Sequence, residues 1–570
     1  MRSMIDEKQY LIPGGVGVME YLHSKGIYIP APCGGHGTCG KCRIRVMAGA
    51  LPVTESDRAL LSESEINDGK RLACKALPVS PVRISVLNSS SDEDMQVAED
   101  FTPADKDKER IHVALNIGDA ENSRISGEDN EQSYDHNVEE KTDDHKVTGS
   151  AEKAQGITGP CILKKDHEYG IAIDLGTTTL AASLVDMTDK KPVLIRSSVN
   201  RQRAFGADVM SRVESALNGK AEDLKRVIEK DLLLLIEDLC VTSGADVSRL
   251  VISGNTCMYH LLMEYDVSGL AKFPFTPVSL GGEEFTRDQV FSYETEKRNV
   301  LPEDCSVYLV PGFSAFVGGD IASGLIACDL ADKDLNVFFI DIGTNAEMVL
   351  KRGADFLTAS AAAGPALEGG NLKWGTGSVP GAISGASFYD GKMHIKTIGD
   401  TAPSGICGTG AVETVRELLG AGILNGYGTF AKDEYLENGF PLARSVMGDM
   451  IGLDQDDVRQ IQMAKAAICA GAEMLLKAGG VNADELDRVI VSGGFGSFLD
   501  MKKAGDIGLL PEGLALKAEA VGNTSLKGAV MMLTDDRSGE ISKIRDRASL
   551  YDLANDDKFK DRYIECMNFT

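Results

Sequence analysis

One pattern occurs in two distant parts of this chain: an apolar run that ends in Asp-x-Gly-Thr and is followed by a second apolar run. The first copy is IAIDLGTTTLAASLVD, which contains Asp174, and the second is FFIDIGTNAEMVL, which contains Asp341. Such runs predict buried strands, and the Gly-Thr between them predicts a tight turn. One such turn also serves as a plain hairpin. Two copies in similar surroundings predict a duplicated α/β core.

Each turn places a carboxylate, backbone N–H groups and hydroxyl groups at the end of a buried strand. Such a turn can hold phosphate oxygens while the aspartate holds the water shell of Mg²⁺. Because the two halves of a duplicated core would meet at a cleft, we expect both turns to bind one nucleotide triphosphate and its metal. The predicted catalytic residues are Asp174 and Asp341, and the predicted nucleotide-binding residues of the turns are Gly176, Thr177, Thr178, Gly343, Thr344 and Asn345.

Two further segments are candidates for the same cleft. A strand-like run, VIVS, delivers Gly493, Gly494 and Gly496, which would let the backbone approach a flat group such as adenosine. Alone, this run is typical of an ordinary glycine-rich connector. The helix-like segment 316–327 contains Asp320, and an aspartate in a first helical turn often serves as a cap.

The chain divides into four parts by pattern. Strand-like runs alternate with helical segments from residue 169 onward, which predicts two α/β subdomains at 169–334 and 335–570. Residues 1–88 predict a small unit with one helix and several strands. Between them, 91–160 holds 19 Asp and Glu against 7 Lys and Arg. Such a composition buries too little apolar surface to order a chain, so we expect 89–168 to be a disordered acidic linker with one strand-like island at 110–118.

Four of the 12 cysteines lie within the predicted N-terminal unit, three of them in CGGHGTCGKC at 33–42. The spacing is C-x5-C-x2-C, and the fourth cysteine follows much later, in RLACKA. Three ligands in one loop and one remote ligand are typical of a 2Fe–2S cluster, and the glycines between them can bring N–H groups close to the sulfurs. The predicted cluster ligands are Cys33, Cys39, Cys42 and Cys74.

Two other interpretations of this loop were weighed. GHGTCGKC nearly spells a phosphate-binding loop, but Cys42 lacks the hydroxyl that would hold Mg²⁺, so we reject that interpretation. Four thiolates also suit zinc, which usually uses two C-x2-C pairs, and His36 is an alternative ligand. Zinc therefore stays open as the alternative metal.

Composition excludes several classes of function. The formal net charge of −27 argues against nucleic-acid binding, which needs clustered Lys and Arg. An 18-residue apolar run is absent and the first residues lack the apolar core of a signal peptide, so we expect a cytoplasmic protein without a membrane span. In a reducing compartment the scattered cysteines are expected to be small buried apolar residues. These are Cys161, Cys240, Cys257, Cys305, Cys328, Cys407, Cys469 and Cys566.

The glycine segment and the two Asp-x-Gly-Thr segments resemble the superfamily of acetate and sugar kinases, heat-shock chaperones and actin, whose core is ribonuclease H-like. The two turns match its phosphate motifs, residues 493–496 its adenosine motif, and 316–327 its first connecting helix. The last match implies that Asp320 faces the cleft. More specific strings resemble the reductive activators of corrinoid proteins over nearly the whole chain except the acidic segment. These strings are NRQRAFGADVMSRV, SGNTCMYHLL, IDIGTNAEMVL, AAAGPALEGG and SGGFGSF.

This resemblance implies a β-grasp 2Fe–2S ferredoxin domain joined to an actin-like ATPase. It implies ATP-dependent transfer of one electron from the cluster to a Co(II) corrinoid protein, which restores the Co(I) needed for methyl transfer. Asp174 and Asp341 would then position Mg²⁺ and the attacking water. The implied partners are a corrinoid protein and an upstream electron donor, with neither nucleic acid nor membrane, and a homodimer is left open.

Two rival functions remain at this point. The first is a small-molecule kinase or activase with an appended redox-sensing ferredoxin domain, in which replacing the cysteines would leave turnover intact. The second is a non-enzymatic electron-transfer module whose nucleotide fold has decayed. The intact turns at 174–179 and 341–345 argue against decay.

Overall fold

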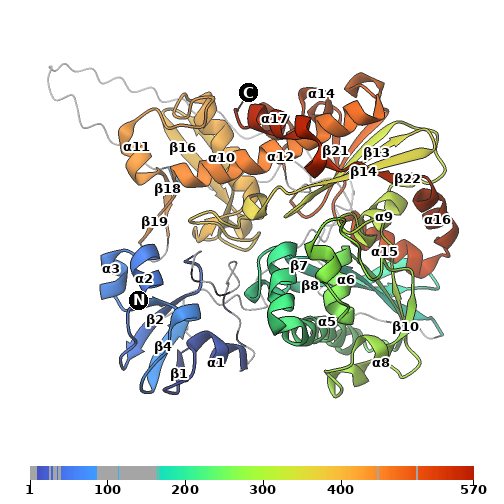
Figure 1. The fold of residues 1–570 in the computed structure, drawn as a ribbon, viewed down its shortest axis with the longest axis horizontal. Coiled ribbons are helices and arrows are strands. Elements are labelled where there is room, and N and C mark those ends of the chain that lie inside the picture. The colour runs from blue at the N-terminus through green and yellow to red at the C-terminus, as the bar shows by residue number, and fades with distance from the viewer. Residues whose placement is uncertain are drawn as a thin grey trace, which may run out of the picture.

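The computed structural model describes residues 9–24, 27, 29, 35, 37, 40–86, 113–114, 163–164, 166–445, 448–495 and 499–569. Figure 1 shows a small N-terminal unit and two larger α/β units that lie against each other. Of the predicted acidic linker 89–168, only a few positions lie within the described residues. Two of these positions form the short strand β5 (Val113–Ala114), which lies inside the strand-like island 110–118 and pairs with β16 (Lys392–Thr397).

The N-terminal unit is a four-stranded sheet in the order β1-β4-β2-β3, with antiparallel pairs throughout. Its core is formed by apolar side chains such as Ile44, Leu72 and Ile84. The carboxylate of Asp57 is buried and accepts the N–H of Leu72 at 2.8 Å, which ties α2 to β3. The elements are β1 (Gln9–Ile12), α1 (Val18–Ser24), β2 (Arg43–Ala48), α2 (Glu55–Leu60), α3 (Glu63–Asn67), β3 (Lys70–Leu72), η1 (Ala73–Lys75) and β4 (Val82–Val86).

The first α/β unit is built on a six-stranded sheet in the order β10-β11-β9-β6-β7-β8. Its first Asp-x-Gly-Thr segment forms the hairpin β6–β7, as predicted, and β6 pairs in parallel with β9. The long helix α5 covers one face. The elements are β6 (Tyr169–Leu175), β7 (Thr179–Asp186), β8 (Lys191–Val199), α4 (Val209–Ser215), α5 (Ala221–Ser243), β9 (Val247–Gly254), α6 (Thr256–Met263), α7 (Ser268–Ala271), β10 (Glu284–Thr286), α8 (Arg287–Val290), β11 (Ser306–Leu309) and α9 (Gly319–Ala327).

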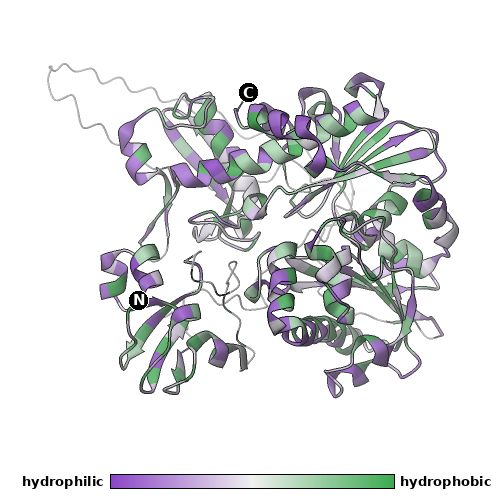
Figure 2. Cartoon of the chain, in the orientation of Figure 1, coloured by the Kyte–Doolittle hydropathy of each residue, from purple (hydrophilic) through white to green (hydrophobic). Residues whose placement is uncertain are grey.

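The second α/β unit repeats this arrangement with a sheet in the order β21-β20-β12-β13-β14-β22. The second Asp-x-Gly-Thr segment forms the hairpin β12–β13, and β12 pairs in parallel with β20. The order β11-β9-β6-β7-β8 in the first sheet thus corresponds to β21-β20-β12-β13-β14 in the second, which confirms the predicted duplicated core. Figure 2 shows hydrophobic residues along the strands of both sheets.

The remaining elements of this unit form an inserted four-stranded sheet, β17-β15-β16-β5, a two-stranded ribbon, and surrounding helices. The elements of the second unit are β12 (Val337–Ile342), β13 (Ala346–Arg352), β14 (Asp355–Ala361), η5 (Pro365–Glu368), β15 (Ala382–Tyr389), β17 (Gly405–Ile406), α10 (Gly408–Gly420), α11 (Asp433–Asn438), β18 (Phe440–Arg444), β19 (Met450–Leu453), α12 (Gln455–Gly479), η7 (Ala483–Glu485), β20 (Arg488–Ser492), α13 (Met501–Asp506), α14 (Glu512–Ala515), β21 (Ala518–Ala520), α15 (Thr524–Thr534), α16 (Ser538–Asp546), β22 (Ala548–Leu550) and α17 (Asp557–Cys566).

A third apolar cluster joins the two α/β units. Alternate residues of β6 point to opposite sides, so that Ile171 and Ile173 enter the core under α5 whereas Ala172 enters the shared cluster. Helix α9 of the first unit packs there against α15 of the second, through residues such as Leu325 and Ala529. This packing brings the carboxyl ends of β6 and β12 to one cleft.

Candidate nucleotide cleft and cluster loop

A cavity of about 220 Å³ lies between the two α/β units, and both Asp-x-Gly-Thr turns line it. The structure brings together at this cavity every predicted nucleotide-site residue that it describes. These are Asp174, Gly176, Thr177, Thr178, Asp320, Asp341, Gly343, Thr344, Asn345, Gly493 and Gly494. The remaining predicted residue, Gly496, lies outside the described residues.

The two strand-end aspartates are held by hydroxyl and amide donors from other elements. Asp174 accepts hydrogen bonds from Ser525 Oγ at 2.7 Å and Asn523 Nδ2 at 2.8 Å, at the start of α15. Asp341 accepts one from Ser492 Oγ at 2.8 Å, at the end of β20. Burial raises the pKa of Asp174, and burial raises the pKa of Asp341 to about 6, with like charges nearby adding to the rise.

Two more carboxyl groups face the same space. Asp320 lies in the first turn of α9, and burial followed by the charge of Asp341 raises its pKa to about 7. Glu347 on β13 was not predicted, and its pKa is raised well above its usual value by burial and then by Asp320 and Asp341. A single carboxylate in the otherwise apolar run AEMVL was the sequence signal for it. Crowded carboxyl groups of this kind favour a bound cation, because a cation relieves their mutual repulsion.

Glu368, at the end of η5, connects the two turns and was also not predicted as a site residue. Its oxygen Oε2 accepts a hydrogen bond from Thr178 Oγ1 at 2.8 Å and another from Thr344 Oγ1 at 2.7 Å. These hydroxyl groups are the donors that the turns would offer to a phosphate oxygen. One side chain therefore joins both turns through the groups expected to bind phosphate.

The glycines of the cleft leave room that another residue would fill. A Cβ on Gly176 would lie 2.4 Å from the carbonyl oxygen of Thr179. At Gly493, φ is +97° and a Cβ would lie 2.8 Å from Oδ1 of Asp341. Gly494 faces open space. Small turns, hydroxyl donors and clustered carboxylates together fit a nucleotide phosphate chain with a divalent cation.

The cluster loop ends next to the strands of the N-terminal unit. The antiparallel pair Arg43↔Leu72 brings Cys42 close to Cys74, and the N–H of Ala73 donates to the carbonyl oxygen of Cys42 at 2.8 Å. A Cβ on Gly35 would lie 3.9 Å from Cβ of Cys74, so the loop passes over the remote cysteine. The three described glycines of the loop, Gly35, Gly37 and Gly40, all have φ between +67° and +85°.

This arrangement fits a cluster that is held by one loop and one remote cysteine. The two described candidate ligands, Cys42 and Cys74, lie close together although two helices and two strands separate them in the chain. The loop glycines adopt the left-handed conformation that lets backbone N–H groups turn toward a ligand. The other two predicted ligands, Cys33 and Cys39, lie outside the described residues.

The cluster loop contacts the second α/β unit close to the nucleotide cleft. Lys41 Nζ donates to the carbonyl oxygen of Leu372 at 2.5 Å. Leu372 lies shortly after Glu368 in the segment that follows η5. The next residue, Lys373, donates its N–H to Asp457 Oδ1 at 2.6 Å, at the start of α12. One short segment thus runs from the bridge between the turns to the cluster loop.

Three family models match the chain in consecutive parts. Residues 5–79 match the 2Fe-2S iron-sulfur cluster binding domain, residues 169–333 the RACo middle region, and residues 336–570 the C-terminal domain of RACo, the ASKHA domain. The last two together cover most of the chain. These matches confirm the predicted fold class of a ferredoxin domain joined to a duplicated actin-like core.

One similar protein and one solved structure cover the chain almost end to end, and a further relative covers about two thirds of it. The corrinoid activation enzyme RamQ of Eubacterium limosum is 28% identical over 96% of this chain and 95% of its own. The [Co(II) methylated amine-specific corrinoid protein] reductase of Methanosarcina barkeri is 27% identical over 63% of this chain and 68% of its own. A solved structure titled reductive activator for corrinoid, iron-sulfur protein matches with a TM-score of 0.64 and 28% identity, over 99% of this chain and 97% of its own.

The membrane prediction has one structural test. Among the residues that the structure describes, no helix has both the length and the apolar character needed to cross a bilayer.

Proposed function

Because this chain belongs to the family of reductive activators of corrinoid proteins, we propose that it uses ATP to drive one electron from a 2Fe–2S cluster to a Co(II) corrinoid protein. The product is Co(I), the state that methyl transfer needs. The observation that carries the proposal is the path from the bridged turns, through residues 369–372, to the cluster loop. We propose four parts of the chain: the ferredoxin domain 1–88, the linker 89–168, and the two subdomains 169–334 and 335–570. That an upstream electron donor reduces the cluster, and that two chains form a homodimer, remain predictions.

The energy that ATP must provide is modest. Plant-type clusters have potentials near about −400 mV, and we expect the Co(II)/Co(I) couple to be lower. For one electron a gap of ~100–150 mV lowers the equilibrium constant by roughly 50–350-fold, or about 2–4 kcal/mol. Differential binding of a nucleotide to two conformations can supply this amount. The proposed role of the cleft is therefore to couple nucleotide binding to a change in conformation.

Within the cleft, each group has a proposed role. Asp174 and Asp341 would hold Mg²⁺, which would neutralise phosphate charge when bound. The hydroxyl groups of Thr178 and Thr344 would donate to phosphate oxygens. Their present acceptor is Glu368, so an incoming phosphate has to displace that carboxylate. The negative charge of the phosphate would repel the negative carboxylate of Glu368 and so favour its displacement.

Displacement of Glu368 would act on the cluster loop through a short stretch of chain. Gly369, directly after Glu368, has φ of +79°, and a Cβ there would lie 2.0 Å from the carbonyl oxygen of Thr376. This close approach joins the start of the segment to its end, so we expect residues 369–376 to move together. The carbonyl group of Leu372 that accepts from Lys41 lies in this segment. Binding of ATP would thus change how the cluster domain is held.

The test uses the full chain, purified without air and reduced with a low-potential chemical reductant. Purified corrinoid proteins in the Co(II) state are added, and Co(I) is followed by absorbance with Mg-ATP, with Mg-ADP and without nucleotide. The proposal expects Co(I) in the first case and little in the others. Equal amounts of Co(I) in all three would refute ATP coupling. Phosphorylation of a small metabolite without Co(I) would favour the rival kinase instead.

A further inference from the structure

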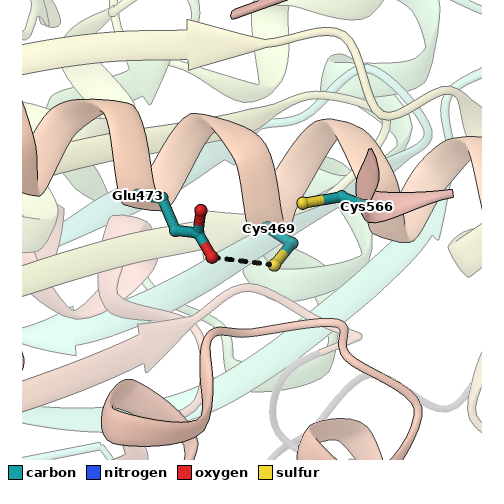
Figure 3. A group of neighbouring side chains, drawn as sticks. All are labelled: Cys469, Glu473 and Cys566. Atoms are coloured by element: carbon teal, nitrogen blue, oxygen red, sulfur yellow. Dashed lines mark hydrogen bonds between the residues drawn. The ribbon is translucent and has the colours of Figure 1, made fainter. Parts of the chain in front are cut away.

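Two cysteines that are far apart in the chain meet at the end of the second α/β unit. Cys469 lies in the middle of α12, and Cys566 is the last residue of α17. Their sulfur atoms and a carboxylate oxygen of Glu473 all lie within 4.8 Å of one another. Figure 3 shows Cys469 and Glu473 on one helix, with Cys566 entering from the neighbouring segment. The sequence prediction treated both cysteines as isolated buried residues, and the structure shows that these two are a pair.

The contact lies in a small apolar patch between the two helices. Ala466 and Ala470, each close to Cys469 in the helix, are fully buried and let the helices approach closely. The two cysteines are only 7% and 6% exposed. Beyond Cys566, Gln462 donates to the carbonyl oxygen of Met567 at 2.8 Å. The last helix therefore packs on α12 through this patch, and the two sulfurs lie within it.

A metal ion is the first alternative for such a group, and the contacts of Glu473 argue against it. Arg562 of α17 binds both carboxylate oxygens, with Nη2 2.8 Å from Oε1 and Nε in contact with Oε2. A cation would have to displace this guanidinium and then lie beside its positive charge. The group that is available for chemistry is therefore the pair of sulfurs.

The two thiols differ in character. The Cys469 thiol donates to Glu473 Oε1 at 3.9 Å. The contact between the two thiols lowers the pKa of Cys566, and the same contact, followed by burial, raises the pKa of Cys469. The positive charge of Arg562 acts on the pKa of Cys566 in the same direction. Of the two thiols, Cys566 is therefore the one that ionises more easily, and such a difference is found in reactive dithiols.

We propose that Cys469 and Cys566 form a reversible disulfide that ties α17 to α12 when the protein meets a small disulfide such as oxidised glutathione. The Cys566 sulfur attacks one sulfur of the small disulfide, and one small thiol leaves. The Cys469 sulfur then attacks Cys566 in the mixed disulfide, and the second small thiol leaves. The two cysteines lose two electrons and two protons, which the small disulfide gains.

Such a bond would stabilise the second α/β unit, which forms one side of the nucleotide cleft, against unfolding. Helix α12 packs on β13, on β14 and on η5, which ends in Glu368. A disulfide that closes a loop of this length restricts the unfolded chain strongly. The bond would form under the oxidising conditions that also remove electrons from a low-potential protein. It would thus stabilise the second unit until reducing conditions return.

The test uses the full chain with its cluster, treated with oxidised glutathione without air, followed by alkylation of free thiols, digestion and mass spectrometry. We expect a peptide pair that joins Cys469 to Cys566 and that disappears on reduction. In a separate thermal melt, the oxidised chain should unfold at a midpoint higher by on the order of 5–10 °C. Cys469→Ala and Cys566→Ala should lose the rise. Cys328→Ala, which removes a partly buried cysteine outside this pair, should keep both the cross-linked peptide and the rise of the melting midpoint.

Three outcomes would overturn the proposal. One is that both thiols are alkylated after oxidation, and another is that each carries glutathione without joining the other. The third is that the purified chain holds a zinc ion that Cys566→Ala releases, which would make the group a metal site. Peptide mapping of the unaltered chain decides the first two even if the variants fail to fold.

Discussion

Replacing Glu368 by glutamine tests whether this side chain competes with phosphate or helps to bind it. The variant keeps the size of the side chain and one acceptor oxygen for Thr178 and Thr344 but removes the charge. If the carboxylate competes with phosphate for the two hydroxyl groups, the loss of its charge should strengthen binding of Mg-ATP. If it is instead a ligand for the metal or the attacking water, its loss should weaken binding of Mg-ATP.

The size of the effect follows from the two hydrogen bonds. A hydrogen bond to a charged acceptor contributes about 1.5–3 kcal/mol, against about 0.5–1.5 kcal/mol for a neutral one. The two hydrogen bonds together therefore contribute roughly 2–3 kcal/mol less free energy with the glutamine than with the glutamate. Since Glu368 borders a cavity that opens to solvent, we reduce this to about 1–2 kcal/mol. That amount corresponds to about 5–30-fold tighter binding of Mg-ATP in the variant.

The assay is a titration of Mg-ATP into the full chain by calorimetry, with and without the substitution. Glu485→Gln is the matched control, because Glu485 also accepts two hydrogen bonds on one oxygen, both from Asn482, but does not line the cleft. We expect the control to bind as the unaltered chain does. Weaker binding in Glu368→Gln, or equal binding in all three proteins, would refute the proposed competition.

Three further predictions concern the cleft and the cluster loop. Asp341→Ala should abolish nucleotide-dependent formation of Co(I) and leave the visible spectrum of the cluster unchanged, and a lost spectrum would show that the two sites are not separate. Because burial raises the pKa of Asp341 to about 6, its ionisation destabilises the folded protein progressively as pH rises from about 4 to above 6. Asp341→Asn should therefore raise the melting midpoint more at pH 7.5 than at pH 5 in calorimetry without nucleotide, and an equal rise at both would contradict this. Lys41→Met should keep the cluster spectrum but lower the ratio of Co(I) formation with ATP to that without it, and an unchanged ratio would remove the contact with Leu372 from the mechanism.

Local sequence patterns predicted those site residues that lie at the ends of strands. An apolar strand, a turn and a second strand occupy consecutive residues, so the sequence alone specifies the hairpins that contain Asp174 and Asp341. The closeness of Cys42 to Cys74 was likewise predictable from cysteine spacing. These features depend on contacts within a hairpin or between neighbouring strands.

The features that the sequence did not predict depend on packing between distant segments. Glu368 lies in a glycine-rich segment without periodicity, and its bridge exists only because the two halves of the fold face each other. The meeting of Cys469 with Cys566 requires the last helix to dock on α12. No local pattern reports such a contact, because neither residue differs from an ordinary buried cysteine within its own helix.

These unpredicted contacts show how the cleft could act on a cluster held by another domain. A ligand changes the balance of two conformations only if it interacts differently with each. In the structure, Glu368 accepts from the hydroxyl groups that phosphate would need, so that bridge and a bound phosphate would exclude each other. Because Leu372 lies a short way further along the chain and accepts from Lys41, we expect release of the bridge to change the segment that contacts the cluster loop. Under the proposed function, competition for two hydroxyl groups would link nucleotide binding to the position of the cluster.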